Sequence, residues 1–190
     1  MVRMKAAQAV LIGSTILASW LGMQAVHELG HVCGAWLTGG HVSRVVLHPL
    51  AISRTDLAEN PAPLIVVWAG PLLGAAVPVL AWLAAALAKT PGSFLLRFFA
   101  GFCLVANGLY IGLGSFGRIG DCGEMLRHGS QPWQLGLFGL LTVPAGFWLW
   151  HKQGPNFGLG PSAKPISATV AYVTLGVCVV MIAAELILSR

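Results

Sequence analysis

The sequence predicts an all-α polytopic membrane protein, with about five transmembrane helices and a short surface strand or hairpin after the first. Of the 190 residues, 56% are hydrophobic and 9% are charged, and the mean hydropathy is +0.78. Ordinary globular domains carry about 25% charged residues. The apolar residues also form long runs, and a backbone in lipid must satisfy its hydrogen bonds within helices. We therefore expect one membrane-embedded domain, 1–190, in a multi-pass integral protein of the cell membrane.

Five apolar runs are predicted to be spanning helices. They cover residues 6–37, 61–88, 94–114, 133–150 and 166–188. The first run begins like a signal peptide, but its apolar character continues to Leu37, which favours a retained helix. Its length of roughly 48 Å exceeds a hydrocarbon core of about 30 Å. We therefore expect this helix to tilt, protrude or bend, with Gly22 as the candidate bend.

Helix-ending and helix-starting residues delimit the next elements. Gly39-Gly40 is predicted to end the first helix, because glycine is common just beyond a helix C-terminus. The polar segment 41–55 is too short to span, and its β-branched residues and partial alternation predict a strand or hairpin at the membrane surface. Asn60-Pro61 is predicted to start the second helix, with Asn as N-cap and Pro in the first helical position.

The connections between the later spans determine which polar residues can meet. A tight turn is predicted at 89–92, a Gly-rich polar connection at 115–130 and a Gly/Pro-rich loop at 151–164. Successive spans alternate in direction, so the third span returns to the side on which the first one ends. We therefore expect the 115–130 connection to lie close to the end of the first helix.

The most informative motif is His27-Glu28-Leu29-Gly30-His31, late in the first predicted helix. Residues i and i+4 lie one above the other on a helix, so both imidazoles can reach one cation. The glutamate lies beside this pair without having to be a ligand, and it can take a proton from a metal-bound water. We expect His27 and His31 to bind one Zn²⁺ per chain and Glu28 to be the catalytic base. The alternative is a polar helix face paired structurally with its neighbours.

Catalytic zinc usually takes three protein ligands and one water, so a third ligand is expected. Asp121 is the favoured candidate, because it lies in the connection predicted to reach the same side. The alternatives are Glu124, Asp56, Glu59, Cys122 and the histidines His41, His48, His128 and His151. These carboxylates and histidines are more simply explained as solvated groups of loops and helix ends. Glu185, near the C-terminus, is expected to extend its side chain to the membrane interface.

These elements together resemble the site-2 protease family of intramembrane zinc metalloproteases. The matching features are the HELGH motif on a membrane helix, the Gly39-Gly40 turn, Ala69-Gly70-Pro71 and Gly120-Asp121-Cys122-Gly123, and they span roughly residues 20–126. The resemblance implies His27 and His31 as zinc ligands, Glu28 as base and Asp121 as third ligand. It also implies a site below the membrane surface on the cytosolic side.

The chain departs from the family pattern at two places. The family's aspartate motif usually reads Leu-Asp-Gly shortly after Asn-Pro, whereas no proline lies close to Gly120-Asp121-Cys122-Gly123. The asparagine often found near the Gly-Pro of the second span is missing, because 72–76 is Leu-Leu-Gly-Ala-Ala. Asn107 is a candidate to steady a substrate carbonyl in its place, although an interhelical hydrogen bond is the commoner use of such a residue.

The expected activity is hydrolysis of a peptide bond in or near a transmembrane segment of another membrane protein. The segment 42–47 is a candidate to pair with an extended substrate by strand addition. The net charge of +5 comes from scattered residues, so we expect the lipid bilayer and a membrane-protein substrate as partners, and no nucleic acid. The alternative function is a non-catalytic membrane protein, either a metal permease or a degenerate protease fold that binds membrane partners.

Overall fold

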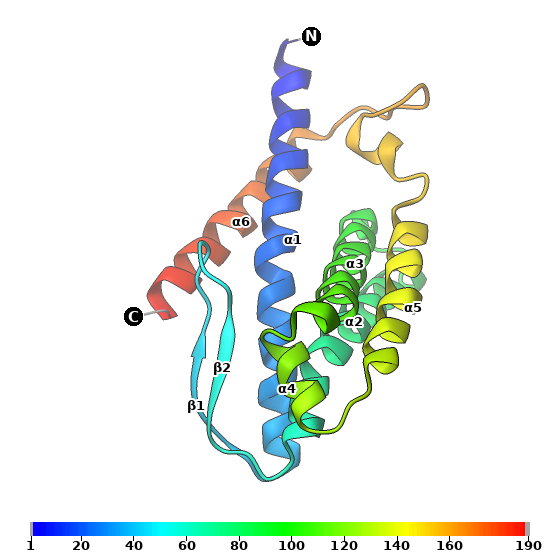
Figure 1. Cartoon of the computed structure of the whole chain (residues 1–190). Helices are drawn as coiled ribbons and strands as arrows, with labels where there is room; N and C mark the ends of the chain where they lie inside the picture. Colours follow the sequence, from blue (N-terminus) through cyan, green and yellow to red (C-terminus); the bar gives the residue numbers. More distant parts are fainter. Residues whose placement is uncertain (1, 189–190) are drawn as a thin grey trace.

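The computed structural model describes residues 2–188 of the chain and is mostly helical (Figure 1). The elements are α1 (Val2–Leu37), β1 (His41–Val46), β2 (Arg54–Glu59), α2 (Pro63–Leu87), α3 (Ser93–Gly117), α4 (Asp121–Arg127), α5 (Pro132–Trp150), the 3₁₀-helix η1 (Gly154–Phe157) and α6 (Ala168–Leu188). Within this described part, four helices, α1, α2, α3 and α6, are long and apolar enough to cross a membrane. The predicted helical membrane character is confirmed at this level, but the count is four rather than about five. The fourth predicted span does form a helix, α5, but Gln134 and several tryptophans and prolines make it less apolar.

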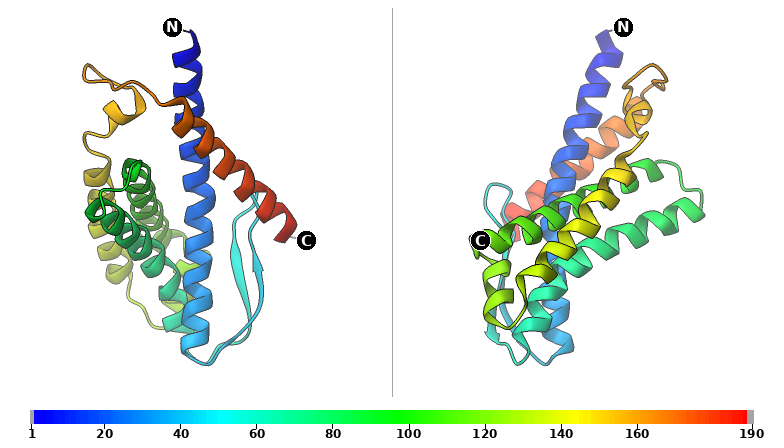
Figure 2. Two further views of the ribbon diagram at one scale, coloured as in Figure 1. Left: turned by 180° about the vertical axis from the view of Figure 1, so that it is seen from behind. Right: turned by 45° about the vertical axis from the view of Figure 1, so that its right-hand side comes forward.

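α1 is the axis around which the other elements are arranged. Figure 1 and the left view of Figure 2 show α2, α3 and α5 on one side of α1, and the hairpin with the C-terminal end of α6 on the other. The helix is unbroken through Gly22, so the predicted alternatives that remain are a tilted or protruding helix or a gentle bend. A Cβ on Gly22 would lie 3.0 Å from the Phe99 ring, so the missing side chain lets α3 approach α1.

The predicted strand or hairpin after α1 is an antiparallel hairpin, with Val45 paired to Thr55. Gly39 adopts a positive φ of 75°, and the Gly40 amide donates to the Ala35 carbonyl at 2.8 Å, which closes the helix as its glycines predict. The hairpin then returns along α1 instead of lying beyond its end (Figure 1). Ser53 reaches Gln24, which is about 20 Å along the helix from Leu37.

α2 begins later than its sequence predicts. Its first residue is Pro63, and the N-cap residue Ala62 has a φ of −133° and a ψ of 67°. The predicted start at Asn60-Pro61 is therefore wrong. The residue before a proline is sterically kept out of the helical region, so the chain stays extended until Pro63 itself begins the first turn.

α1 and α2 approach closely where α1 carries Gly30 and Gly34. A Cβ on Gly30 would lie 2.5 Å from the Ala69 carbonyl oxygen, and one on Gly34 would lie 2.7 Å from the Ala69 Cβ. Small residues four apart on a helix face let the backbones of two membrane helices come together. This crossing brings the α2 backbone against the HELGH motif.

α4 is held by a small apolar cluster between α2, α3 and α5. Cys122 and Met125 of α4 are fully buried there with Val67, Ile111 and Leu135. The connection predicted at 115–130 therefore contains a short helix. Its first residue, Asp121, is delivered to the face of α1 that carries the two histidines.

Candidate metal centre

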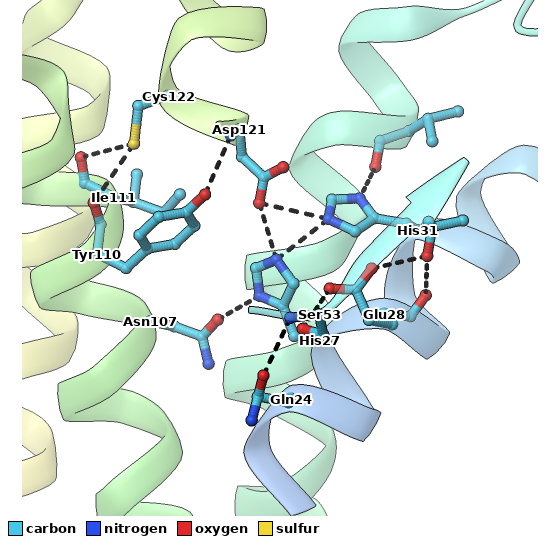
Figure 3. Close-up of polar contacts among 12 residues, drawn as sticks. Gln24, His27, Glu28, His31, Ser53, Asn107, Tyr110, Ile111, Asp121 and Cys122 are labelled. Atoms are coloured by element: carbon cyan, nitrogen blue, oxygen red, sulfur yellow. Dashed lines mark hydrogen bonds and ion pairs between the residues drawn. The ribbon is translucent and has the colours of Figure 1, made fainter. Parts of the chain in front are cut away.

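Three side chains from two elements converge on one point (Figure 3). Nε2 of His27 lies 2.8 Å from Oδ2 of Asp121 and 3.1 Å from Nε2 of His31, and Nε2 of His31 lies 3.4 Å from the same Asp121 oxygen. Ligands of a tetrahedral zinc at about 2.0–2.2 Å from the ion are about 3.3 Å apart. The triangle of the two nitrogens and the oxygen therefore fits a small divalent cation.

Both histidines use their other ring nitrogen to contact a hydrogen-bond acceptor. Nδ1 of His27 lies 2.7 Å from the amide oxygen of Asn107, and Nδ1 of His31 lies 2.9 Å from the Val66 carbonyl oxygen. Neither oxygen can donate, so each Nδ1 must carry the proton. The orientation of the Asn107 amide is fixed in turn, because its Nδ2 donates to the Cys103 carbonyl at 2.9 Å.

This arrangement leaves each Nε2 as the free acceptor of a neutral imidazole. Two lone pairs therefore face each other at 3.1 Å, with a carboxylate oxygen beside them. Both histidines are only 7% exposed, so water does not screen this repulsion well. The site therefore requires a positive charge at its centre, either a proton or a metal ion.

Asp121 is oriented by a contact from α3. Its backbone N–H donates to the hydroxyl of Tyr110 at 3.1 Å. Gly120, just before it, has a φ of 59°, and a Cβ there would collide with the Tyr110 hydroxyl, so both its backbone and its surroundings require glycine. Burial alone would raise the pKa of Asp121, but when a proton occupies the centre the His27 and His31 imidazoles donate to its carboxylate and hold this pKa well below its usual value. Asp121 is therefore an anion facing the two imidazoles.

Glu28 is buried beside this group, with 3% of its surface exposed. Its carboxylate turns toward the hairpin, where Oε1 accepts from the Ser53 hydroxyl and Oε2 from the Thr55 hydroxyl, each at 2.7 Å (Figure 3). It is not a member of the three-residue group that could hold a metal. Glu28 therefore lies next to the candidate metal centre without being a ligand, which is the position of a proton acceptor for a metal-bound water.

Comparisons with protein-family models, curated proteins and solved structures find no match to this chain. The chemistry of the site therefore follows from its own donor set. Two imidazole nitrogens, one carboxylate oxygen and an adjacent glutamate form a combination that zinc hydrolases use.

Three of the alternative third ligands, Asp56, Glu124 and Cys122, have partners elsewhere. Asp56 pairs with Arg54 at 3.1 Å on the exposed face of the hairpin, and Glu124 pairs with Arg127 at 2.8 Å. The thiol of Cys122 contacts the Tyr110 carbonyl on α3 at 3.3 Å, and burial raises its pKa to about 11. Glu185 is 5% exposed on α6, so its side chain packs against the rest of the described residues.

Asn107 lies in the site, but its amide contacts His27 and Cys103 rather than being left free for a substrate carbonyl. It is 1% exposed, and both ends of its amide are engaged, the oxygen by His27 and the nitrogen by Cys103. The bond to His27 joins α3 to α1 and orients a candidate ligand, whereas the bond to Cys103 lies within α3. The two bonds leave little capacity for a substrate carbonyl, so the interhelical alternative describes this residue better than substrate positioning.

A cavity of about 710 Å³ opens in front of the three converging side chains. Its size is within the range of ligand sites in proteins, about 300–1,000 Å³. Its apolar walls come from α1, the hairpin and α2, and include Trp20, Met23, Ile52, Leu57, Val66 and Val67. The candidate metal centre is therefore reached through a cavity with largely apolar walls.

Three functional side chains and one backbone group were not predicted. Ser53, Thr55 and Tyr110 contact Glu28 or Asp121, and the Val66 carbonyl orients His31. The sequence gives a weak indication of Ser53 and Thr55, because residues two apart in an extended chain place both hydroxyls on one face. The Val66 carbonyl leaves no sequence signal, since any residue could supply it.

Proposed function

We propose that this chain is a membrane-embedded zinc metallopeptidase of the site-2 protease type. It would hydrolyse a peptide bond in or near a transmembrane segment of a membrane-protein substrate. The observation that carries the proposal is the convergence of the His27 and His31 Nε2 lone pairs with the Asp121 carboxylate, directly beside the buried Glu28. Such a cluster has little structural purpose without a cation.

His27, His31 and Asp121 would hold the zinc ion. When bound, zinc supplies the Lewis acidity that activates both the scissile carbonyl and the attacking water. Asn107 and the Val66 carbonyl keep both imidazoles in the tautomer with a free Nε2.

Glu28 would act as general base and then as general acid. Its carboxylate takes the proton of the attacking water and returns it to the leaving amide nitrogen. Because the side chain is buried and held by two hydroxyls, it is already oriented before substrate arrives. A positioned base of this kind typically contributes a rate factor of about 10² to 10⁴.

The cavity supports an apolar, extended substrate. Trp20, Met23 and Ile52 offer contacts to hydrophobic side chains, whereas a substrate helix must unwind before its carbonyl can reach the centre. Among the described residues β1 pairs with β2 alone, so segment 42–47 remains a candidate for pairing with the unwound stretch.

Glu28→Gln in the purified full-length chain tests the proposal. We expect about one zinc per chain, as in the wild type, and cleavage of single-span membrane substrates reduced by at least about 100-fold. His27→Ala and His31→Ala should lose both zinc and cleavage, whereas Glu59→Gln, at an exposed carboxylate at the end of β2, should keep both. New substrate termini are measured by mass spectrometry. Undiminished cleavage by Glu28→Gln would contradict the proposal, and no cleavage by the zinc-loaded wild type would favour the non-catalytic alternative.

A further inference from the structure

The hairpin contributes the hydrogen bonds that hold the Glu28 carboxylate. Ser53 Oγ donates to one carboxylate oxygen and Thr55 Oγ1 to the other, both at 2.7 Å. Ser53 and Thr55 are two apart in an extended chain, so their side chains share the face directed at α1. Arg54 between them points the other way, where it pairs with Asp56. Glu28 thus lies on α1, while its donors come from a different element.

These two bonds are strong ones. An O–H donor at 2.5–2.7 Å from a carboxylate oxygen is typical of a charge-assisted hydrogen bond, roughly twice as strong as a neutral one. An ionised carboxylate offers about four lone-pair positions, so two hydroxyls fix its plane and leave one position on each oxygen. The remaining positions can then accept a proton from only a narrow range of directions.

The docking of the hairpin does not depend on these hydroxyls alone. The backbone N–H of Ser53 donates to Oε1 of Gln24 at 3.1 Å, one turn before Glu28. This bond persists when the side chain of residue 53 is shortened. The role of the hydroxyls can therefore be separated from the attachment of the hairpin.

We propose that Ser53 and Thr55 are positioning residues for Glu28, so that the hairpin is part of the catalytic apparatus. The proposal rests on the proposed function, in which Glu28 is the base. The base is aligned when the hairpin lies on α1, and it loses its orientation when the hairpin moves away. A substrate that displaces the hairpin without restoring these two bonds would bind and not be cleaved.

The test compares Ser53→Ala, Thr55→Val and the double variant with the conservative variants Ser53→Thr and Thr55→Ser. Each single removal should lower kcat about 10-fold and the double removal about 100-fold, within the range that general-base catalysis supplies. Zinc content should stay within about twofold of wild type because the ligands are untouched. KM should also stay within about twofold, because Ala and Val keep nearly the same side-chain size where Ser53 and Thr55 line the cavity. The conservative variants keep a hydroxyl and should retain kcat within about threefold. Ser43→Ala is the matched control, since its hydroxyl contacts the Asp56 carbonyl on the same hairpin.

A second measurement does not need turnover. The carboxylate stretching band of Glu28 is obtained as the infrared difference between wild type and Glu28→Gln. It should shift in the Ser53→Ala/Thr55→Val double variant and stay unchanged in Ser43→Ala.

The outcomes separate this inference from the proposed function. Cleavage that survives Glu28→Gln would overturn the proposed function, while the infrared band would still report on the two hydroxyl contacts. An unshifted band, or a wild-type kcat in the double variant together with an inactive Glu28→Gln, would overturn the positioning role alone. A raised KM with unchanged kcat would likewise overturn it and assign the hydroxyls to substrate binding.

Discussion

The amide oxygen of Asn107 lies 2.7 Å from Nδ1 of His27, so α3 supplies the group that orients a candidate ligand on α1. The two residues are 80 positions apart in the chain. This bond fixes the ring angle of His27 and the nitrogen on which its proton sits. It therefore couples the packing of two membrane helices to the chemistry of the centre.

Removal of this acceptor should weaken metal binding. We expect Asn107→Leu to lower zinc affinity about 10- to 100-fold, because the ring loses its orientation and its tautomer preference. Asn107→Asp keeps an oxygen in place and should lie closer to wild type. Affinity is measured by competition with a chromophoric chelator. Wild-type affinity in Asn107→Leu would show that the bond does not orient a ligand.

Asp121→Ala should remove the third ligand. Zinc content is expected to fall from about one per chain to a small fraction of that, since two imidazoles alone bind zinc poorly. The control is Glu124→Ala, on the same short helix but paired with Arg127 at the surface. Zinc is measured by mass spectrometry on the purified chains. Unchanged zinc in Asp121→Ala would mean that another carboxylate completes the site.

Tyr110→Phe tests the contact that orients Asp121. The Asp121 backbone N–H loses its acceptor, so the aspartate becomes less constrained and zinc affinity should fall about 10-fold. The matched control is Tyr172→Phe, at the other tyrosine of the chain, which is 57% exposed on α6. Equal zinc affinity in the two variants would remove Tyr110 from the site.

Gly70→Ala should disrupt the site by steric conflict. A Cβ at this buried position of α2 would overlap the His31 imidazole, which has no room to retreat because Nδ1 is bonded to Val66. We expect loss of zinc with helix content retained by circular dichroism. Gly136→Ala in α5, where a Cβ meets nothing within 4 Å, should keep zinc. Full zinc occupancy in Gly70→Ala would show that the α1–α2 contact can adjust.

Elements that depend on local sequence were predictable. The HELGH spacing places two imidazoles and a glutamate on one helix whatever surrounds it, and the glycines at 39 and 40 end α1 where expected. The approach of Asp121 could be predicted from the alternation of spans, because direction depends only on their number. The positions of His27, Glu28 and His31, and the approach of Asp121 to them, could therefore be predicted from the sequence.

The rest depends on how helices cross. The Val66 carbonyl reaches His31 only because Gly30 and Gly34 let α2 approach, and Ser53 reaches Glu28 only because the hairpin turns back along α1. Neither crossing distance nor hairpin direction is encoded in the local pattern of polar and apolar residues. The start of α2 was predicted at Pro61 and lies at Pro63, because the sequence offers two prolines and either could occupy the first helical position.

The continuity of α1 determines which part of the centre can move. His27 and His31 are one turn apart on an unbroken helix, so their separation is set by the helix itself and survives any rearrangement elsewhere. Asp121 belongs to a seven-residue helix behind a glycine of positive φ. A change in the distance between Asp121 and the two histidines therefore requires α4, or the Asp121 side chain, to move relative to α1. A pair of spectroscopic labels on these two helices would follow such a movement of α4 directly.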